Sequence, residues 1–145
     1  MDEHIDPLII GDDLRTREAH LHIWSEVVDG LNEGIVVTGL DGTILDCNPA
    51  FERITGYSRA EVLGLNPRIL KSGRHDAVFY AALWDALVTR GSWVGELWNR
   101  RKDGEIYPER LALRAVRGAD GLPSHYVGMF SDISREKQDQ ARLDY

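Results

Sequence analysis

The sequence predicts an α+β domain built around a five-stranded antiparallel sheet. Three Asp-Gly pairs, at 41–42, 103–104 and 120–121, each stand between two runs that favour strands. Asp-Gly is a strong hairpin signal, because both residues tolerate the positive φ that a tight two-residue primed turn needs. The segments that favour helices fall mostly between the second and third strands. Helices inserted at one point of the chain can cover only one face of the sheet, so we expect the other face to meet water or a further element.

The size and charge of the chain narrow the possible classes of function. Its 145 residues suit one domain with a sizeable core. The net charge of −7 argues against a nucleic-acid-binding protein, which would need clustered positive charge. The single cysteine, Cys47, fits a reducing compartment. Because no apolar run is long enough for a membrane span and no secretory leader is visible, we expect a cytoplasmic protein without direct membrane insertion.

The N-terminal part predicts a flexible segment followed by an amphipathic helix. Residues 1–12 are polar with Pro7 and Gly11 as breakers, and Asp12 or Asp13 can cap a helix over residues 13–31. The apolar positions of this helix follow heptad spacing and are Leu14, Leu21, Trp24, Val28 and Leu31. Such a short stripe favours either a homodimer or docking of the helix on its own domain, and both remain open here.

The next segment alternates strands and capped helices. Strands are expected over 34–38 and 43–47, and Asn48 is a natural N-cap for a helix that begins at Pro49 and ends near Gly56. Ser58 caps a helix over 59–63, and residues 65–74 are expected to form a turn and loop. Asp76 caps a longer helix to about Arg90, whose apolar stripe is Phe79, Leu83, Ala86 and Leu87.

The stretch 92–107 carries the most informative pattern. Side chains alternate across a strand, so Trp93, Gly95, Leu97 and Asn99 share one face, which is apolar except for the Asn99 amide. A buried amide must find a hydrogen-bond partner or cost roughly 1–3 kcal/mol. That partner is either nearby backbone beside the tight Asp103-Gly104 turn or a bound ligand.

Two more strands and a helix close the chain. We expect strands over 105–116 and 124–133, followed by a charged helix from Arg135, capped by Ser134, that continues beyond the C-terminus toward an output domain. The sheet face away from the inserted helices would carry Trp98, Ala112, Val127 and Met129, which is too apolar for bare solvent. The N-terminal helix with Trp24 is its expected cover.

From about Leu31 to Ser134 the sequence resembles a PAS domain. The order and spacing of short markers carry this resemblance: Gly34-Ile35, Asp41-Gly42, Asn48-Pro49-Ala50-Phe51, Thr55-Gly56-Tyr57, Glu61-Val62-Leu63-Gly64, Arg101-Lys102-Asp103-Gly104, Tyr126-Val127-Gly128 and Asp132-Ile133-Ser134. The resemblance implies a PAS sensory domain over 32–134 whose five-stranded sheet cups a small cavity. Residues 135–145 would then begin a linker helix to an output domain of a bacterial signal-transduction protein.

Within that family, Trp93-Val94-Gly95 followed by Asn99-Arg100-Arg101 is similar to flavin-binding redox and oxygen sensors of the nitrogen-fixation-regulator and aerotaxis type. In those domains a tryptophan at the place of Trp93 lies near the flavin. The resemblance therefore implies a flavin cofactor, FAD, in the cavity.

The light-oxygen-voltage branch of the family is a more distant relative. Its Gly-x-Asn-Cys-Arg motif corresponds to Gly64-Leu65-Asn66-Pro67-Arg68, so Pro67 replaces the photoreactive cysteine and the thiol photoadduct should be impossible. The resemblance assigns Asn66 and Arg68 to the ribityl-phosphate arm and Asn99 to the ring edge. Glu109 stands where that branch has a second ring-facing asparagine, and Phe130 where it has a signalling glutamine. These two departures leave room for another ligand or none.

The cofactor-binding set predicted from the sequence is Asn66, Arg68, Trp93, Asn99, Glu109, Leu111 and Phe130. Some of these residues have a plainer alternative. Trp93 is equally explained as a core aromatic, and Glu109 as a carboxylate at the cavity edge paired with Arg68 or Arg101. Arg68 by itself is more often a surface arginine, although together with Lys71 and Arg74 it could contact a phosphate at a pocket mouth.

Three hypotheses for the function follow. The first is a flavin-holding redox or oxygen sensor, the second a cofactor-free module that dimerises and relays a signal, and the third a haem or small-metabolite sensor. His75 would be the haem ligand, and His125 lies on a strand. A sensor domain rather than an enzyme is expected, because neither a phosphate-binding Gly-rich loop nor metal-ligand spacing nor a nucleophile set stands out.

Overall fold

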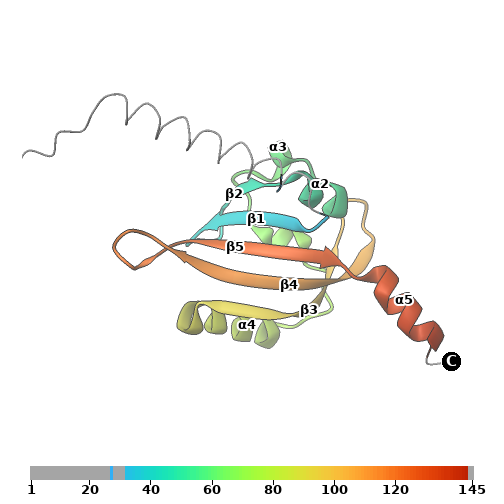
Figure 1. Cartoon of the computed structure of the whole chain (residues 1–145). Helices are drawn as coiled ribbons and strands as arrows, with labels where there is room; N and C mark the ends of the chain where they lie inside the picture. Colours follow the sequence, from blue (N-terminus) through green and yellow to red (C-terminus); the bar gives the residue numbers. More distant parts are fainter. Residues whose placement is uncertain (1–26, 28–31, 144–145) are drawn as a thin grey trace, which may run out of the picture. The chain divides into compact units, whose positions relative to one another are not determined.

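The computed structural model describes Val27 and residues 32–143, and residues 32–145 form a unit separate from 1–31. The expected flexible N-terminus and, apart from Val27, the helix over 13–31 lie outside the described residues. Five strands make one antiparallel sheet in the order β2-β1-β5-β4-β3 (Figure 1), which confirms the predicted α+β class. Their bounds are β1 Gly34–Gly39, β2 Ile44–Cys47, β3 Ser92–Arg100, β4 Ile106–Arg117 and β5 Pro123–Asp132.

Four short helices connect β2 to β3, and a fifth follows β5. They are α2 Pro49–Thr55, α3 Arg59–Val62, the 3-10 helix η1 Pro67–Leu70, α4 Ala77–Arg90 and α5 Ser134–Leu143. In the folded domain α2 contacts β1, α3 contacts β2, and α4 contacts β3 and β4 (Figure 1). The inserted helices thus cover opposite ends of the sheet, and side chains from α2, η1 and α4 face one shared interior space.

Asn48 fastens the start of α2 to the start of the sheet. Its Oδ1 accepts the amide N–H of Phe51 at 3.0 Å and of Ile35 at 2.8 Å, while its Nδ2 donates to the Glu33 carbonyl at 2.9 Å. The side chains of Ser58 and Asp76 accept amides in the first turns of α3 and α4. The N-caps predicted at Asn48, Ser58 and Asp76 are therefore confirmed.

The three Asp-Gly hairpins share one geometry, which differs from the tight two-residue turn expected at 103–104. In each, the glycine has positive φ, at 86°, 95° and 80°, whereas no other residue type in the described chain does. The aspartate carboxylate accepts the amide two residues later, as Asp103 does from Glu105 at 2.9 Å. The expectation of two residues with positive φ was wrong, because a three-residue loop needs only one left-handed residue, the glycine.

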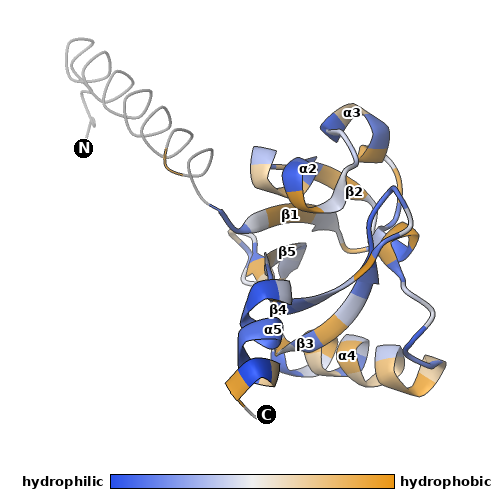
Figure 2. Cartoon of the chain, turned by 90° about the vertical axis from the view of Figure 1, so that its right-hand side faces the viewer, coloured by the Kyte–Doolittle hydropathy of each residue, from blue (hydrophilic) through white to orange (hydrophobic). Residues whose placement is uncertain are grey.

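The C-terminal helix begins at Ser134, one residue earlier than expected. Its first amide, on Ser134, is held by the Asp132 carboxylate at 2.9 Å, so Asp132 rather than Ser134 acts as the cap. Figure 2 shows α5 as mostly hydrophilic, and all its described residues except Ser134 are exposed. Ion pairs join its first turn to β3 and β4, from Lys137 to Glu96 at 2.8 Å and from Glu136 to Arg110 at 3.2 Å.

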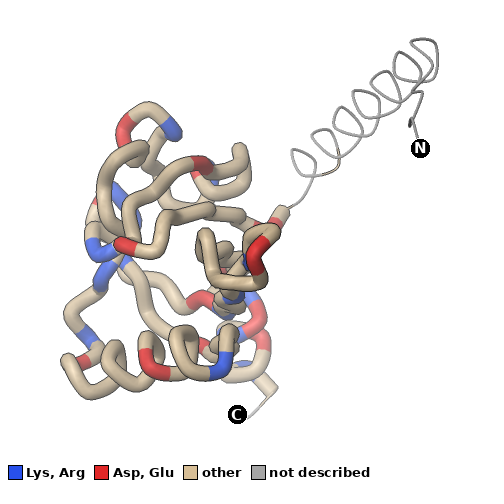
Figure 3. Tube along the Cα trace, turned by 90° about the vertical axis from the view of Figure 1, so that its left-hand side faces the viewer, with Lys and Arg blue, Asp and Glu red and all other residues tan. Residues whose placement is uncertain are grey.

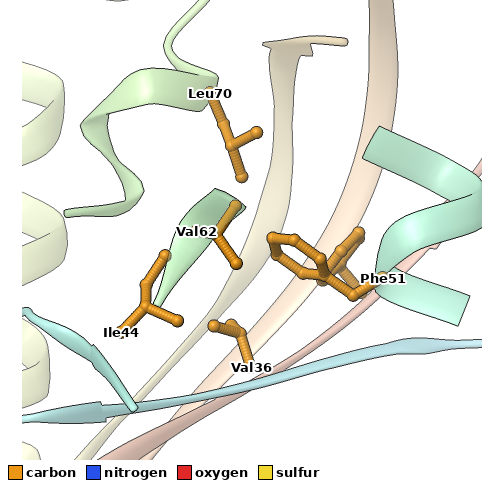
Figure 4. Packing of buried hydrophobic residues seen from close by; sticks show 6 residues of the cluster. Val36, Ile44, Phe51, Val62 and Leu70 are labelled. Carbon is orange, nitrogen blue, oxygen red and sulfur yellow. The ribbon is translucent and has the colours of Figure 1, made fainter. Parts of the chain in front are cut away.

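The hydrophobic core lies between the sheet and the α2–η1 segment. Figure 4 shows its side chains pointing toward one another from β1, β2, α2, α3 and η1; the cluster is Val36, Ile44, Phe51, Val62, Leu70 and Phe130. Phe51 is fully buried and meets the Phe130 ring edge to face at a centroid distance of 5.8 Å. Such close packing of apolar side chains is the main source of stability in a domain of this size.

The outer sheet face carries an apolar row in register across four strands. Cross-strand pairs place Val94 beside Ala112, Ala112 beside Met129, and Met129 beside Ile35. Val94 is 71% exposed and Met129 38%. Trp98, expected on the same face, is half-buried because the Arg74 guanidinium lies 4.3 Å from its ring centre. Charged positions of both signs are interspersed elsewhere along the chain (Figure 3).

Candidate functional site

A cavity of about 420 Å³ lies between the sheet and the helices. Most of its wall is apolar: Leu83 and Leu87 face it from α4, and Leu97, Leu111 and Leu113 from β3 and β4. Its volume is within the range of roughly 300–1,000 Å³ that small-molecule sites occupy. The alternation predicted around Asn99 is confirmed, since Leu97 and Asn99 line the cavity and the even-numbered residues of β3 do not.

A buried carboxyl group stands at the sheet side of this cavity. Glu109 is 2% exposed, and its Oε1 accepts the Tyr107 hydroxyl at 2.8 Å. The Asn99 side chain, 8% exposed, also hydrogen-bonds Glu109. Burial raises the pKa of Glu109 to about 7, the negative charge of Asp132 adds to the rise, and the hydrogen bonds from Tyr107 and Asn99 oppose it. Glu109 can therefore hold or release a proton near neutral pH.

The expected pairing of Glu109 with Arg68 or Arg101 does not occur. Arg101 instead donates to Glu105 at 2.7 Å, to the Ile54 carbonyl at 2.7 Å and to Asp132 at 2.6 Å. The reason is positional: Arg101 lies just beyond β3, and its guanidinium lies over the Tyr107 ring, 4.1 Å from the ring centre. The fixed partners of Glu109 are thus neutral, and its charge is not cancelled by a cation in contact.

Tyr80 adds a polar atom that sequence reasoning missed. Its side chain lines the cavity from α4, and its hydroxyl is buried with no hydrogen-bond partner among the described residues. Burial raises the pKa of this phenol, and the nearby Glu109 charge contributes. A buried hydroxyl without a partner costs free energy, which a bound ligand could recover. The helical spacing of Tyr80 with Leu83, Trp84 and Leu87 was the signal that could have found it.

The mouth of the cavity is formed by η1 and the β1–β2 loop. Arg68 and Lys71 line it together with Asp41, and the Lys71 ammonium lies 4.1 Å from the Tyr80 ring centre. Asn66, also in the lining, is the N-cap of η1 and accepts the Arg68 amide at 3.0 Å. Two cationic side chains at the opening could contact an anionic group of a ligand.

Six of the seven predicted site residues line this cavity: Asn66, Arg68, Asn99, Glu109, Leu111 and Phe130. Trp93 does not belong to the lining. Its ring lies over Gly95, where an added Cβ would stand 2.7 Å from it, and it meets Phe79 of α4 at a centroid distance of 6.0 Å. Trp93 therefore closes the packing between β3 and α4 next to the cavity.

The two histidines among the described residues, His75 and His125, and the cysteine do not line the cavity. His75 Nε2 accepts a hydrogen bond from the backbone N–H of Trp98 at 2.8 Å, so it pairs a backbone donor at the outer edge of β3. His125 is exposed on β5. No cluster of potential metal-binding side chains occurs in the described part of the chain. Cys47 is outside the cavity lining and burial raises its thiol pKa to about 11, while Pro67 is in the lining.

A five-stranded antiparallel sheet that cups a ligand-sized cavity against short helices defines a class of sensory domains. A family model described as the PAS fold matches residues 23–133, and the chain belongs to the PAS family. This confirms the resemblance seen in the sequence.

Individual proteins show where in the family the chain lies. It is 35% identical over 117 residues to the nitrogen fixation regulatory protein of Klebsiella oxytoca; the match covers 81% of this chain and 24% of that protein. The crystal structure of a PAS domain from Colwellia psychrerythraea has a TM-score of 0.73 at 26% identity, with 79% of this chain and 98% of that one covered. A light-oxygen-voltage domain whose mechanism was studied with a flavin analogue has a TM-score of 0.64 at 28% identity, with 77% of this chain and 84% of that one covered.

The chain therefore spans about a quarter of the length of the nitrogen fixation regulatory protein it matches. Within the described residues, no helix combines the length and the apolar composition that crossing a membrane would require.

Proposed function

We propose that this chain is a flavin-binding PAS sensory module that detects redox state or oxygen and passes the signal to an output domain. The observation that carries the proposal is a set of buried polar groups in a largely apolar cavity wall. The Tyr80 hydroxyl, which has no hydrogen-bond partner among the described residues, lines the cavity together with the amide of Asn99 and the carboxyl group of Glu109. Such a set is needed to orient a planar ligand with one polar edge.

The residues present fit a flavin. Its ring system is flat and largely apolar, with one edge that presents two carbonyl oxygens on either side of an N–H. Tyr80 and Asn99 can donate to carbonyl oxygens, and the Glu109 carboxylate can accept an N–H. Leucines from β3, β4 and α4 supply the apolar contacts. Bound flavin would supply reversible electron transfer, while the chain binds it, orients its edge and shields it from water.

The mouth of the cavity supports a flavin that carries phosphate. Arg68 and Lys71 are positioned there to contact phosphate oxygens. Arg74, which the sequence also suggested for this role, lies outside the cavity lining with its guanidinium on the Trp98 ring. The similarity to a nitrogen fixation regulatory protein and to a light-oxygen-voltage domain studied with a flavin analogue supports the same cofactor class. We favour FAD, as the sequence resemblance implies. Pro67 in the lining and the remoteness of Cys47 argue against a cysteinyl photoadduct.

An absorption spectrum of the purified chain tests the proposal. We expect the oxidised-flavin bands, release of FAD on denaturation, and reversible bleaching by dithionite and air. Tyr80→Phe should weaken retention of the flavin, whereas Tyr57→Phe, at a half-buried tyrosine outside the cavity lining, should not. A colourless protein that stays colourless after incubation with FAD and with FMN would contradict the proposal.

A cofactor-free homodimer that relays a signal is the second candidate, and the exposed row Val94, Ala112, Met129 and Ile35 favours it. We propose that residues 13–31 of this chain or of a second copy cover this row. The segment carries the heptad stripe with Trp24, and it directly precedes the strand that contains Ile35. Sedimentation of a chain beginning at Leu31 should show lost dimerisation with a folded domain; an unchanged dimer would exclude this interface.

A further inference from the structure

A continuous series of contacts leads from the cavity to the first turn of α5. Glu109 accepts a hydrogen bond from the Tyr107 hydroxyl at 2.8 Å. The next contact is from the Tyr107 ring to the Arg101 guanidinium, which lies 4.1 Å from the ring centre. Arg101 donates to Asp132 at 2.6 Å, and Asp132 accepts both the amide and the hydroxyl of Ser134. Every member is at least partly shielded from water, since Arg101 has a side chain 18% exposed and Asp132 one 27% exposed.

The register of the sheet also brings Glu109, at the cavity end of this series, close to Asp132, at its α5 end. Glu109 on β4 and Asp132 on β5 are direct cross-strand partners. The Pro108 carbonyl also accepts the amide of Ile133, the residue that joins β5 to α5. A charge at Glu109 is therefore felt at Asp132 both through space and through Tyr107 and Arg101.

We propose that the protonation state of Glu109 controls how firmly Asp132 caps the start of α5, with Tyr107 and Arg101 as the connecting residues. An ionised Glu109 repels the Asp132 carboxylate and attracts Arg101 toward Tyr107, which loosens the cap. A protonated Glu109 neither repels Asp132 nor attracts Arg101, so the ion pair between Arg101 and Asp132 is undisturbed and the cap tightens. Any ligand that changes the charge at Glu109 would thereby change the helix that leaves the domain; only the identity of that ligand rests on the proposed function.

Other charged groups set the background for this coupling. Tyr80 lines the cavity from α4, and its phenol interacts electrostatically with Glu109. Tyr126, buried on β5, is a further phenol in the cavity lining. Arg68, Lys71 and Asp41 lie at the mouth of the cavity, where solvent screens them. Burial and Asp132 place the pKa of Glu109 near 7, so both of its protonation states are populated at neutral pH.

Nuclear magnetic resonance of the ligand-free chain tests the coupling without requiring any flavin. The side-chain carboxyl signal of Glu109 gives its pKa, and the amide exchange of residues 134–137 reports on the cap. We expect protection of these amides, corrected for intrinsic exchange, to be roughly threefold higher at about pH 5.5 than at about pH 8.5, the scale of a partly screened charge coupling. In Glu109→Gln the difference should vanish, with protection fixed at the higher level.

Coupling between two sites is reciprocal, so changes near α5 must move the pKa of Glu109. Asp132→Asn removes a repelling charge and should lower that pKa by roughly one unit. Tyr107→Phe removes a hydrogen bond to the carboxylate and should raise it. The opposite signs separate the coupling from general damage to the fold.

Glu96→Gln provides the matched control. It removes the ion pair from Glu96 to Lys137, a second attachment of α5 that does not include Glu109. Protection should fall equally at both pH values and the pH difference should persist. The proposal is overturned if Glu109→Gln keeps the pH difference at Ser134, or if neither Asp132→Asn nor Tyr107→Phe moves the Glu109 pKa. A colourless protein would refute the flavin while leaving this result intact.

Discussion

The two halves of the space between sheet and helices differ in what they bury. Under α2 and η1 the sheet meets an interlocked apolar cluster centred on Phe51. Beside α4 the same sheet leaves a cavity and buries Glu109 with a pKa near 7, together with a tyrosine hydroxyl that has no partner among the described residues. The first half follows the rules for a stable core and the second violates them. Violations of this kind are expected where a protein holds a ligand.

The largest expected effect concerns the packed half. Phe51→Ala should destabilise the domain by about 3–5 kcal/mol, because it removes a fully buried ring and leaves a void among fixed neighbours. Leu83→Ala on the cavity wall should cost less, about 2 kcal/mol, since this leucine already has open space on one side. Urea unfolding of both variants measures the difference. Equal losses would show that the two halves are packed alike.

The next prediction concerns pH. The pKa of Glu109 is raised from 4.5 in the unfolded chain to about 7 in the folded one, so the folded state binds this proton more tightly. The resulting stability is fully present below pH 4.5 and is lost as pH rises through about 7. Between pH 5 and pH 8, the free energy of unfolding of the wild type should fall by up to about 3 kcal/mol relative to that of Glu109→Gln.

Urea unfolding of the two proteins at both pH values provides the measurement, and contributions from histidines cancel in the comparison. Parallel stability curves across this range would mean that Glu109 is ionised in the folded protein at all of these pH values.

A smaller difference in stability is expected between variants that remove a helix cap in each of the two halves. Asn48→Ala should cost about 2 kcal/mol, at the upper end for a cap, because Asn48 also holds the Ile35 amide and the Glu33 carbonyl. Asp76→Ala should cost about 1 kcal/mol, since the side chain of Asp76 accepts only the amide of Phe79 among the hydrogen bonds described for it. Thermal unfolding ranks the two, and the reverse order would contradict this account of Asn48.

The smallest change in stability is expected at Tyr80. Tyr80→Phe removes a hydroxyl that makes no hydrogen bond to the described residues. The free energy of unfolding of the ligand-free protein should therefore change by no more than about 0.5 kcal/mol, or rise slightly. Flavin affinity should fall roughly tenfold, the equivalent of about 1.4 kcal/mol for one lost hydrogen bond. A titration followed by flavin fluorescence determines the affinity. Unchanged affinity would show that Tyr80 does not touch the ligand.

Much of this arrangement was predictable because it depends on local rules. Caps at Asn48, Ser58 and Asp76 and the alternation around Asn99 follow from residue type and spacing, and they place the strands and helices correctly. The Asp103-Gly104 turn was placed correctly but its geometry was not, because a hairpin of two or three loop residues has the same sequence signal.

The candidate site was less predictable because its details depend on distant residues. The alternation that placed Asn99 inward also suggested Trp93, yet the cavity ends before that position, where Phe79 of α4 fills the space. Tyr80 looked like one more position on an amphipathic helix, and only the fold shows that its hydroxyl is buried, within the electrostatic influence of Glu109 and without a hydrogen-bond partner among the described residues. Likewise, the partner of Arg101 proved to be Asp132, 31 residues later in the sequence.

The central claim is that the half of the interior beside α4, where the sheet leaves a cavity, exists for a ligand and contributes little to the stability of the empty domain. Thermal unfolding of wild type and Tyr80→Phe with increasing FAD tests it most directly, because a ligand that binds only the folded state stabilises it by about 2.7 kcal/mol at one hundred times its Kd. We predict equal midpoints without flavin, a rising midpoint for wild type, and a smaller rise for Tyr80→Phe at each FAD concentration. A wild-type midpoint that does not change with FAD or with FMN would contradict the claim.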